Sequence, residues 1–250
     1  MPVNRELLNA IAENFHMNEA VPDRHIEHLF QSYILRWLTE RLSGSKQVLE
    51  LGVGDGLVLA TLLKRGYELT VIEGSSILVN KVRAECGEAI ECIHTLFEEY
   101  QPTRQFDAVI ASFVFEHVDD PIALLRHMRP WLKPDGRLFI FVPNKMSIHR
   151  QLAVLMGLQP ELDTLSPRDH LVGHQRVYSH ETLSAELTRA QFRVIESTGF
   201  FLKPLPNSMM LDYSMDLLHA LNDIAPRIPQ ELLANIGVVA VPIAAPAANT

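Results

Sequence analysis

The chain has 250 residues, 47% of them hydrophobic and 21% charged. This is typical of a compact protein with one core, or one core with a small lid, and not of two large domains. Its formal net charge is −8, and the sequence contains no long run of Lys or Arg. Nucleic acid is therefore excluded as an expected partner, because a phosphate backbone has to be neutralised by such residues.

Cysteine spacing and apolar runs restrict the expected compartment. The two cysteines, Cys86 and Cys92, match neither a zinc site nor a disulfide framework. The first residues do not have the pattern of a signal sequence. No apolar run reaches the roughly 18 residues of a membrane span. We therefore predict a cytoplasmic protein with no membrane partner.

Strands alternate with helices through the first part of the chain. An amphipathic helix from Ile26 to Leu42 comes first and ends at a Ser-Gly-Ser stretch. The predicted elements that follow are strand 47–51, helix 57–65, strand 69–72, helix 76–86, strands 89–93 and 107–113, helix 121–131 and strand 137–142. The turn Pro134-Asp135-Gly136 sets the start of this last strand at Arg137. The alternation predicts an α/β fold with a doubly wound, mostly parallel sheet.

The pattern loosens after the fifth strand. Residues 144–178, with one helix over 148–156, are too long for an ordinary connection, so we predict a lid insertion there. Strand 192–197, a helical stretch over 208–224 and strand 236–241 complete a seven-stranded sheet whose last strand is antiparallel. We expect an N-terminal helical cap over residues 1–45 and an α/β domain over 46–250.

A glycine-rich turn follows the first predicted strand, in Gly52-Val53-Gly54-Asp55-Gly56. Glycines allow a sharp turn from strand to helix and admit a ligand where a Cβ would collide. A dinucleotide site would place its third glycine at position 57, where this chain has Leu57. The turn therefore predicts a ligand seat and argues against NAD.

A carboxylate stands at the end of the second predicted strand. Glu73 follows the glycines by about 20 residues, the spacing at which an acidic side chain accepts hydrogen bonds from a ribose diol. The helix after the glycines presents unpaired N–H groups and a positive dipole end to an anion. Together these features predict a pocket for a nucleoside with a carboxylate attached.

Four motifs resemble those of class I, Rossmann-like S-adenosylmethionine-dependent methyltransferases: Glu50-Leu51-Gly52-Val53-Gly54-Asp55-Gly56, Glu73-Gly74-Ser75, Phe115-Glu116-His117-Val118-Asp119-Asp120-Pro121 and Leu132-Lys133-Pro134-Asp135-Gly136. The resemblance covers roughly Val48 to Phe200. It implies S-adenosylmethionine as the cofactor. It also implies these donor-binding residues: Glu50, Gly52, Gly54, Gly56, Glu73, Gly74, Ser75, Leu96, Phe97, Ser112 and Phe113. Many relatives have an Asp after the third strand, whereas this chain reads Thr95-Leu96-Phe97, so we expect backbone contacts to adenine.

Methyl transfer to a hydroxyl needs alignment and is helped by a base that removes the proton. His117, His149 and His174 are the candidate catalytic residues. The candidate substrate-binding residues are Tyr33, His170, Arg176 and Tyr178. A structural role is the competing interpretation for each of them. We predict no metal, because Asp119 and Asp120 stand at a helix start, where capping explains them.

Residues 142–178 and 201–204 resemble a bacterial subgroup that methylates small molecules, with sugars, polysaccharides and secondary metabolites among the acceptors. The expected function is therefore methyl transfer to oxygen or nitrogen of a small molecule, such as a sugar or natural-product intermediate. Two alternatives remain open from the residues alone: a protein that binds the donor without catalysis, and a nicotinamide-dependent oxidoreductase. Neither the acceptor atom nor the oligomeric state follows from the sequence.

Overall fold

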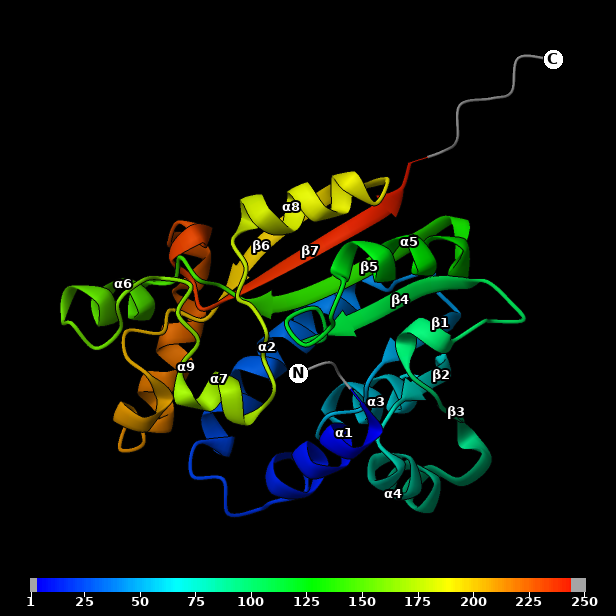
Figure 1. Cartoon of the computed structure of the whole chain (residues 1–250), viewed down its shortest axis with the longest axis horizontal. Coiled ribbons are helices and arrows are strands. Elements are labelled where there is room, and N and C mark those ends of the chain that lie inside the picture. Colours follow the sequence, from blue (N-terminus) through cyan, green and yellow to red (C-terminus); the bar gives the residue numbers. More distant parts are fainter. Residues whose placement is uncertain (1–3, 244–250) are drawn as a thin grey trace.

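The computed structural model describes residues 4–243, so the first three residues of the expected cap and the last seven of the expected domain lie outside it. Its sheet has seven strands in the order β3-β2-β1-β4-β5-β7-β6. The strands are β1 (Gln47–Leu51), β2 (Glu68–Glu73), β3 (Glu91–His94), β4 (Phe106–Ser112), β5 (Leu132–Pro143), β6 (Phe192–Phe200) and β7 (Asn235–Pro242). Strand β7 runs antiparallel to both of its neighbours, and the other pairings are parallel (Figure 1). The predicted fold class is confirmed.

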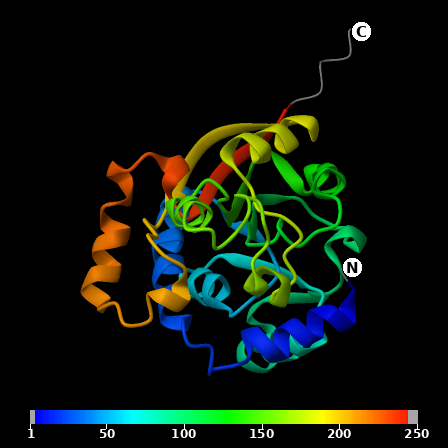
Figure 2. The same cartoon turned by 60° about the vertical axis from the view of Figure 1, so that its left-hand side comes forward.

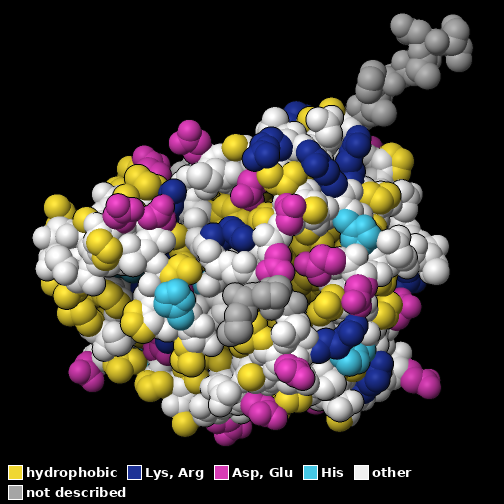
Figure 3. All heavy atoms as spheres, viewed as in Figure 1, with side chains coloured by type: hydrophobic (Ala, Val, Ile, Leu, Met, Phe, Trp, Pro, Cys, Tyr) yellow, Lys and Arg dark blue, Asp and Glu magenta, His cyan; other side chains and the backbone are white. Residues whose placement is uncertain are grey.

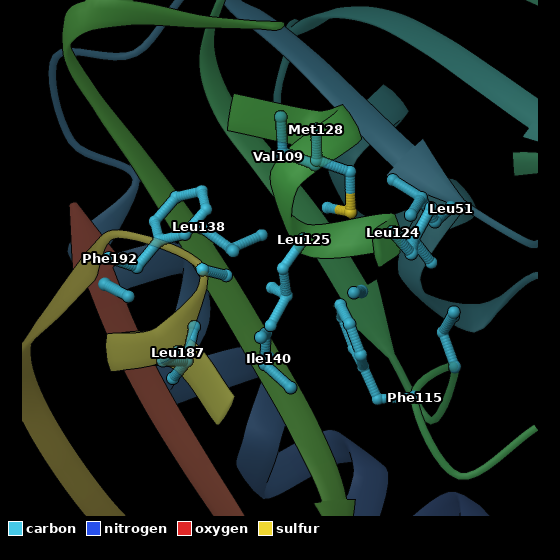
Figure 4. Packing of buried hydrophobic residues seen from close by; sticks show 14 of the residues in the cluster. Leu51, Val109, Phe115, Leu124, Leu125, Met128, Leu138, Ile140, Leu187 and Phe192 are labelled. Carbon is cyan, nitrogen blue, oxygen red and sulfur yellow. The ribbon is translucent and has the colours of Figure 1, made fainter. Parts of the chain in front are cut away.

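Helices cover both faces of the sheet (Figures 1 and 2). They are α1 (Arg5–Ile11), α2 (Arg24–Arg41), α3 (Leu57–Lys64), α4 (Ser76–Cys86), α5 (Pro121–Met128), α6 (Ile148–Leu155), α7 (Pro167–Leu171), α8 (His180–Arg189) and α9 (Met215–Asp223). Alternate residues of each central strand face opposite layers. Leu49 and Val109 pack toward α5 and α8, as the cluster in Figure 4 shows in part, whereas Val48 and Ala108 pack toward α2, α3 and α4. Burial on both faces explains why these strands read as continuous apolar runs.

Strand β5 begins five residues before the predicted start. Leu132 pairs with Phe106 and Arg137 pairs with Ala108, so the Pro-Asp-Gly turn forms a bulge inside the strand. The predicted start at Arg137 was wrong because a turn signature does not tell a loop from a bulge within a strand. Helix α5 likewise ends at Met128 and passes into a 3-10 turn, Arg129–Trp131.

Two helices differ from the sequence prediction in the last third of the chain. Helix α8 was missed, although Ser179 and Thr182 form a capping box and Leu183 and Leu187 are buried at helical spacing. The stretch predicted as helical over 208–224 is shorter as well, because α9 begins after the Ser214 N-cap, and only a 3-10 turn, Asn207–Met209, precedes it. No helix within residues 4–243 is long and apolar enough to cross a membrane.

Two segments lie at the edge of the sheet where β1, β2 and β4 end. The N-terminal segment consists of α1 and a π-helical turn over Ala12–His16, and it precedes α2. The segment 144–178 leaves β5, contains α6 and α7, and returns where Lys145 donates its N–H to the Tyr178 carbonyl at 2.6 Å. In both Figure 1 and Figure 2, α7 lies near α1. On the face seen in Figure 3, basic side chains are interspersed with acidic and hydrophobic ones.

Candidate functional site

The glycine turn joins β1 to α3 in a conformation that glycine favours. Gly52, Gly54 and Gly56 have φ values of +72°, +56° and +86°, which lie in the left-handed region that other residues rarely adopt. The first turn of α3 has no side-chain N-cap hydrogen bond. The N–H of Leu57 donates to the Asp55 Oδ1 at 3.2 Å, so the N–H groups of the next residues in this first turn are the donors that face the glycine turn and suit an anion.

The Glu73 carboxylate at the end of β2 ties two loops together. Its Oε2 accepts the N–H of Val53 at 2.9 Å, and its Oε1 accepts the N–H of Ser75 at 2.7 Å. Burial raises the pKa of Glu73, although these N–H groups favour the charged form. A carboxylate offers about four lone-pair sites, more than the backbone N–H groups of Val53, Gly74 and Ser75 occupy, so Glu73 can still accept a hydrogen bond from a diol.

Glu50 and Phe97 border the glycine turn, and Leu96 borders the loop after β2. Glu50 is buried in β1, and its Oε2 has no hydrogen-bond partner within the described residues. Burial, with Asp55 and Glu73 nearby, raises its pKa well above the ordinary value. A Cβ placed on Gly52 would lie 3.7 Å from Phe97, and one on Gly74 would lie 3.0 Å from Leu96. Phe97 therefore lies over the glycine turn, and Leu96 lies over the loop after β2.

The N-terminal segment contacts both loops. The Asn9 Oδ1 accepts the Ser75 hydroxyl at 2.8 Å, and Leu8 packs directly on the Gly74 backbone. His16 follows in the π-helical turn and lies 3.7 Å from where a Gly54 Cβ would be. The N-terminal segment, which precedes the alternating strands and helices, therefore covers both the glycine turn and the loop after β2.

Strand β4 is followed directly by a strained residue. Phe113 has a φ of +57°, which costs free energy for a side chain with a Cβ and is often found at functional sites. Its N–H is held by the Phe141 carbonyl at 2.8 Å, and its ring packs edge-on against Phe30 with centroids 6.0 Å apart. Because Leu51 pairs with Ala111, Ser112 at the end of β4 and Phe113 after it lie beside the start of the glycine turn.

Of the three candidate catalytic histidines, two are in contact. The rings of His117 and His174 meet edge to face with centroids 4.7 Å apart. Burial and the neighbouring His174 lower the pKa of His117 to about 3, so its ring is neutral at pH 7. Among residues 4–243, His149 is in neither this ring pair nor the cluster around it, and burial and Lys203 lower its pKa to about 2.

Glu116 is buried beside this pair. The Nε2 of His174 lies 4.0 Å from the Glu116 Oε1, and neither carboxylate oxygen has a hydrogen-bond partner within residues 4–243. Burial raises the pKa of Glu116 to about 7. One atom each of Glu116, His117 and His174 lies within 4.8 Å of the other two, a spacing that would also suit a cation. The absence of a metal stays a prediction.

The candidate substrate-binding residues occupy separate places. The Arg176 guanidinium donates to the carbonyls of Phe115 at 3.0 Å and Asp119 at 3.3 Å, and the buried Tyr178 donates to Phe115 at 3.3 Å. Both hold the loop after β4. Tyr33 bonds Asp223 at 2.8 Å between α2 and α9, and His170 is exposed on α7. Their contact with a substrate stays a prediction.

Asp169 was missed by sequence reasoning. It accepts the Nδ1 of His174 at 2.8 Å and is held by Ser166 and Arg150. The pattern Ser166-Pro167-Arg168-Asp169 could have identified a capping box. It could not have shown that the second oxygen of the same carboxylate binds a histidine.

The residues around the turn fit S-adenosylmethionine. The glycine cradle and the first turn of α3 suit its amino-acid end, the carboxylate of Glu73 suits a ribose diol, and Leu96 and Phe97 offer apolar contact for a base. When bound, this cofactor supplies a methyl group on a positively charged sulfur.

Comparison with known proteins agrees with this geometry. The family model described as "Methyltransferase domain" matches residues 23–197. The chain is 26% identical over 206 residues to a ubiquinone biosynthesis O-methyltransferase of Aeromonas salmonicida, covering 80% of this chain and 85% of the relative. It is 28% identical over 211 residues to the protein of the same name from Xylella fastidiosa, covering 81% and 83%.

Solved structures share the fold. The CcbJ methyltransferase of Streptomyces caelestis superposes with a TM-score of 0.59 at 17% identity and covers 95% of this chain and 98% of its own. The glycopeptide N-methyltransferase MtfA with bound S-adenosylmethionine gives 0.57 at 16% identity, covering 85% and 87%. The family match, the cradle and these neighbours make the chain a member of the methyltransferase-domain family, a class I enzyme with S-adenosylmethionine as its cofactor.

Proposed function

We propose that this methyltransferase transfers the methyl group to a hydroxyl oxygen of a small molecule. The observation that carries the proposal is His174: its Nδ1 is bonded to Asp169, while its Nε2 lies 4.0 Å from the nearest carboxylate oxygen, too far for a hydrogen bond. A neutral imidazole with a free nitrogen can remove the proton of a hydroxyl. The relatives named as O-methyltransferases support oxygen as the acceptor atom.

The donor is proposed to lie along the ends of β1, β2 and β4. Its contacts are the residues that the sequence resemblance assigned: Glu50, Gly52, Gly54, Gly56, Glu73, Gly74, Ser75, Leu96, Phe97, Ser112 and Phe113. The acceptor is proposed to enter between the N-terminal segment and the lid over 144–178, because Ile11 packs on Gly173, the residue before His174.

The acceptor class is proposed from the same comparison. The relatives carry the name of ubiquinone biosynthesis, and a hydroxyl on an aromatic ring is acidic enough for a histidine to deprotonate as the methyl bond forms. A sugar or natural-product acceptor, expected from the sequence, has less support, because MtfA is named as a glycopeptide N-methyltransferase and shares 16% identity.

Turnover with matched acceptors tests the proposal. Purified protein, S-adenosylmethionine and three acceptor sets (catechols, sugar hydroxyls and aromatic amines) are compared by release of S-adenosylhomocysteine and by NMR of the product. We expect an O-methyl product from the catechols. A product methylated only on nitrogen would contradict the proposed acceptor atom.

A further inference from the structure

Asp169 makes more contacts than the capping of α7 requires. Its Oδ2 accepts the N–H and the hydroxyl of Ser166, both at 2.8 Å, and the Arg150 guanidinium at 2.9 Å. Its Oδ1 accepts the Nδ1 of His174 at 2.8 Å. One oxygen therefore anchors the carboxylate, and the other is directed at the imidazole.

Arg150 fixes the anchor from a second element. It lies on α6, is itself buried, and its other terminal nitrogen donates to the carbonyls of Leu162 at 3.2 Å and Thr164 at 2.9 Å. The guanidinium thus joins α6, the loop before α7 and Asp169 in one network. A carboxylate held on this many sides cannot turn away from His174 without breaking several bonds.

This anchoring fixes the tautomer of His174. An ionised carboxylate only accepts hydrogen bonds, so the hydrogen of the neutral ring lies on Nδ1 and the lone pair on Nε2. Beyond Nε2 lies the Glu116 carboxylate, fully buried, unpartnered within the described chain and 4.0 Å away. An imidazolium formed at His174 would therefore lie between two carboxylates.

We propose that Asp169 is the positioning residue of His174, and that Glu116 is the second carboxylate that stabilises the imidazolium formed when Nε2 takes the acceptor proton. The inference rests on the proposed O-methyl transfer. In that step the hydroxyl oxygen forms the bond to the methyl carbon, and the carbon–sulfur bond breaks with its electron pair on sulfur. The O–H bond breaks and its proton goes to Nε2, from which solvent later removes it.

Asp169→Asn tests the positioning role, with Asp163→Asn as its control. An amide at position 169 can donate through its NH₂ group and favours the tautomer with hydrogen on Nε2, whereas Asp163 is exposed in the same segment. We expect kcat to fall about 100-fold or more in Asp169→Asn, with the KM of the acceptor and the affinity for S-adenosylmethionine changed less than about threefold. Asp163→Asn is expected to match the wild type.

Nitrogen-15 NMR of the His174 ring tests the same inference without turnover, so its failure is distinct from failure of the proposed function. The signal is assigned by its loss in His174→Gln. We expect the Nδ1–H tautomer in the wild type and the Nε2–H tautomer in Asp169→Asn. A wild-type ring with hydrogen on Nε2 would overturn the proposal.

Two kinetic results would also overturn it. One is an Asp169→Asn protein with wild-type kcat, or one whose KM and donor affinity worsen in step with kcat, which would indicate a structural role. The other is wild-type activity that EDTA abolishes and added Mg²⁺ or Zn²⁺ restores, because the cluster would then hold a cation instead of a proton.

Discussion

The backbone N–H of Val53 donates to the Oε2 of Glu73 at 2.9 Å, so the glycine turn after β1 is fastened to the end of β2. The two loops proposed to border the donor are therefore positioned by one side chain, which also holds the N–H of Ser75. Changes at Glu73 are expected to disturb the turn and the donor contacts together.

Replacement of Glu73 tests this dual role. Hydrogen bonds to a charged group contribute about 1.5 to 3 kcal/mol, so Glu73→Ala should weaken binding of S-adenosylhomocysteine by about 10- to 100-fold in calorimetric titration. Glu68→Ala, an exposed residue at the start of the same strand, is the control. Unchanged affinity in Glu73→Ala would remove this carboxylate from the donor site.

Gly136 is expected to tolerate no side chain. A Cβ there would lie 2.9 Å from three backbone atoms, the N and O of Lys133 and the O of Phe106, none of which can move without shifting the bulge in β5. Gly136→Ala should lower the free energy of unfolding by about 1 to 3 kcal/mol, measured by urea denaturation. Asp135→Ala, exposed beside it, should change little. Equal stability of the two variants would argue against the bulge.

Arg168 connects α7 to the start of α2. Its guanidinium pairs with the buried Asp23 at 2.5 Å and also with Glu27. Arg168→Ala leaves Asp23 with only the Asn207 amide as a side-chain partner among the described residues. Loss of one partner of a fully buried ion pair lowers the free energy of unfolding by about 3 to 5 kcal/mol. Because the Arg168 side chain is 40% exposed, we expect Arg168→Ala to lower it by about 1 to 3 kcal/mol. Exposed Arg227→Ala is the control; a similar melting temperature for both variants would refute the prediction.

Glu116 makes stability depend on pH. Burial raises its pKa from 4.5 to about 7, so the folded state favours the protonated form. The contribution is fully present below pH 4.5 and is lost as the pH rises through 7. His174, Asp169 and Arg176 are the charged or titratable groups that act on it.

Glu116→Gln carries no charge at any pH and should escape this loss. We expect the melting temperature of Glu116→Gln to be similar to that of the wild type at about pH 5 and higher at about pH 8.5. At the higher pH its free energy of unfolding should exceed that of the wild type by about 3 kcal/mol at most. Exposed Glu98→Gln should follow the wild type throughout. A difference that is constant with pH would show that folding does not shift the pKa of Glu116.

The central half of the fold was predictable because its strands are buried on both faces and its turns carry glycine. The bounds of β1 and α4 match the prediction at both ends, since Gly52 and the Ser75 cap are local signals. The start of β5 depends on how Leu132 pairs with Phe106 across the sheet. That pairing is nonlocal, and the sequence of β5 alone does not specify it.

The candidate site likewise has one part that the sequence predicts and one part that it does not. The glycine turn and Glu73 follow from spacing along the chain, whereas the bond between Asp169 and His174 depends on Arg150 from α6 and on the path of an irregular segment. His117, His149 and His174 look alike in the sequence. Only the folded chain shows that the Nδ1 of His174 is bonded to Asp169 and that its Nε2 lies 4.0 Å from Glu116.

Calorimetric titration of the purified protein with S-adenosylmethionine and S-adenosylhomocysteine tests the central claim most directly. We predict saturable binding of one molecule per chain, lost in Gly54→Val because a β-branched residue cannot adopt the φ of +56° at that position. A folded wild-type protein that binds neither compound would contradict the donor site and, with it, the methyl transfer derived from it.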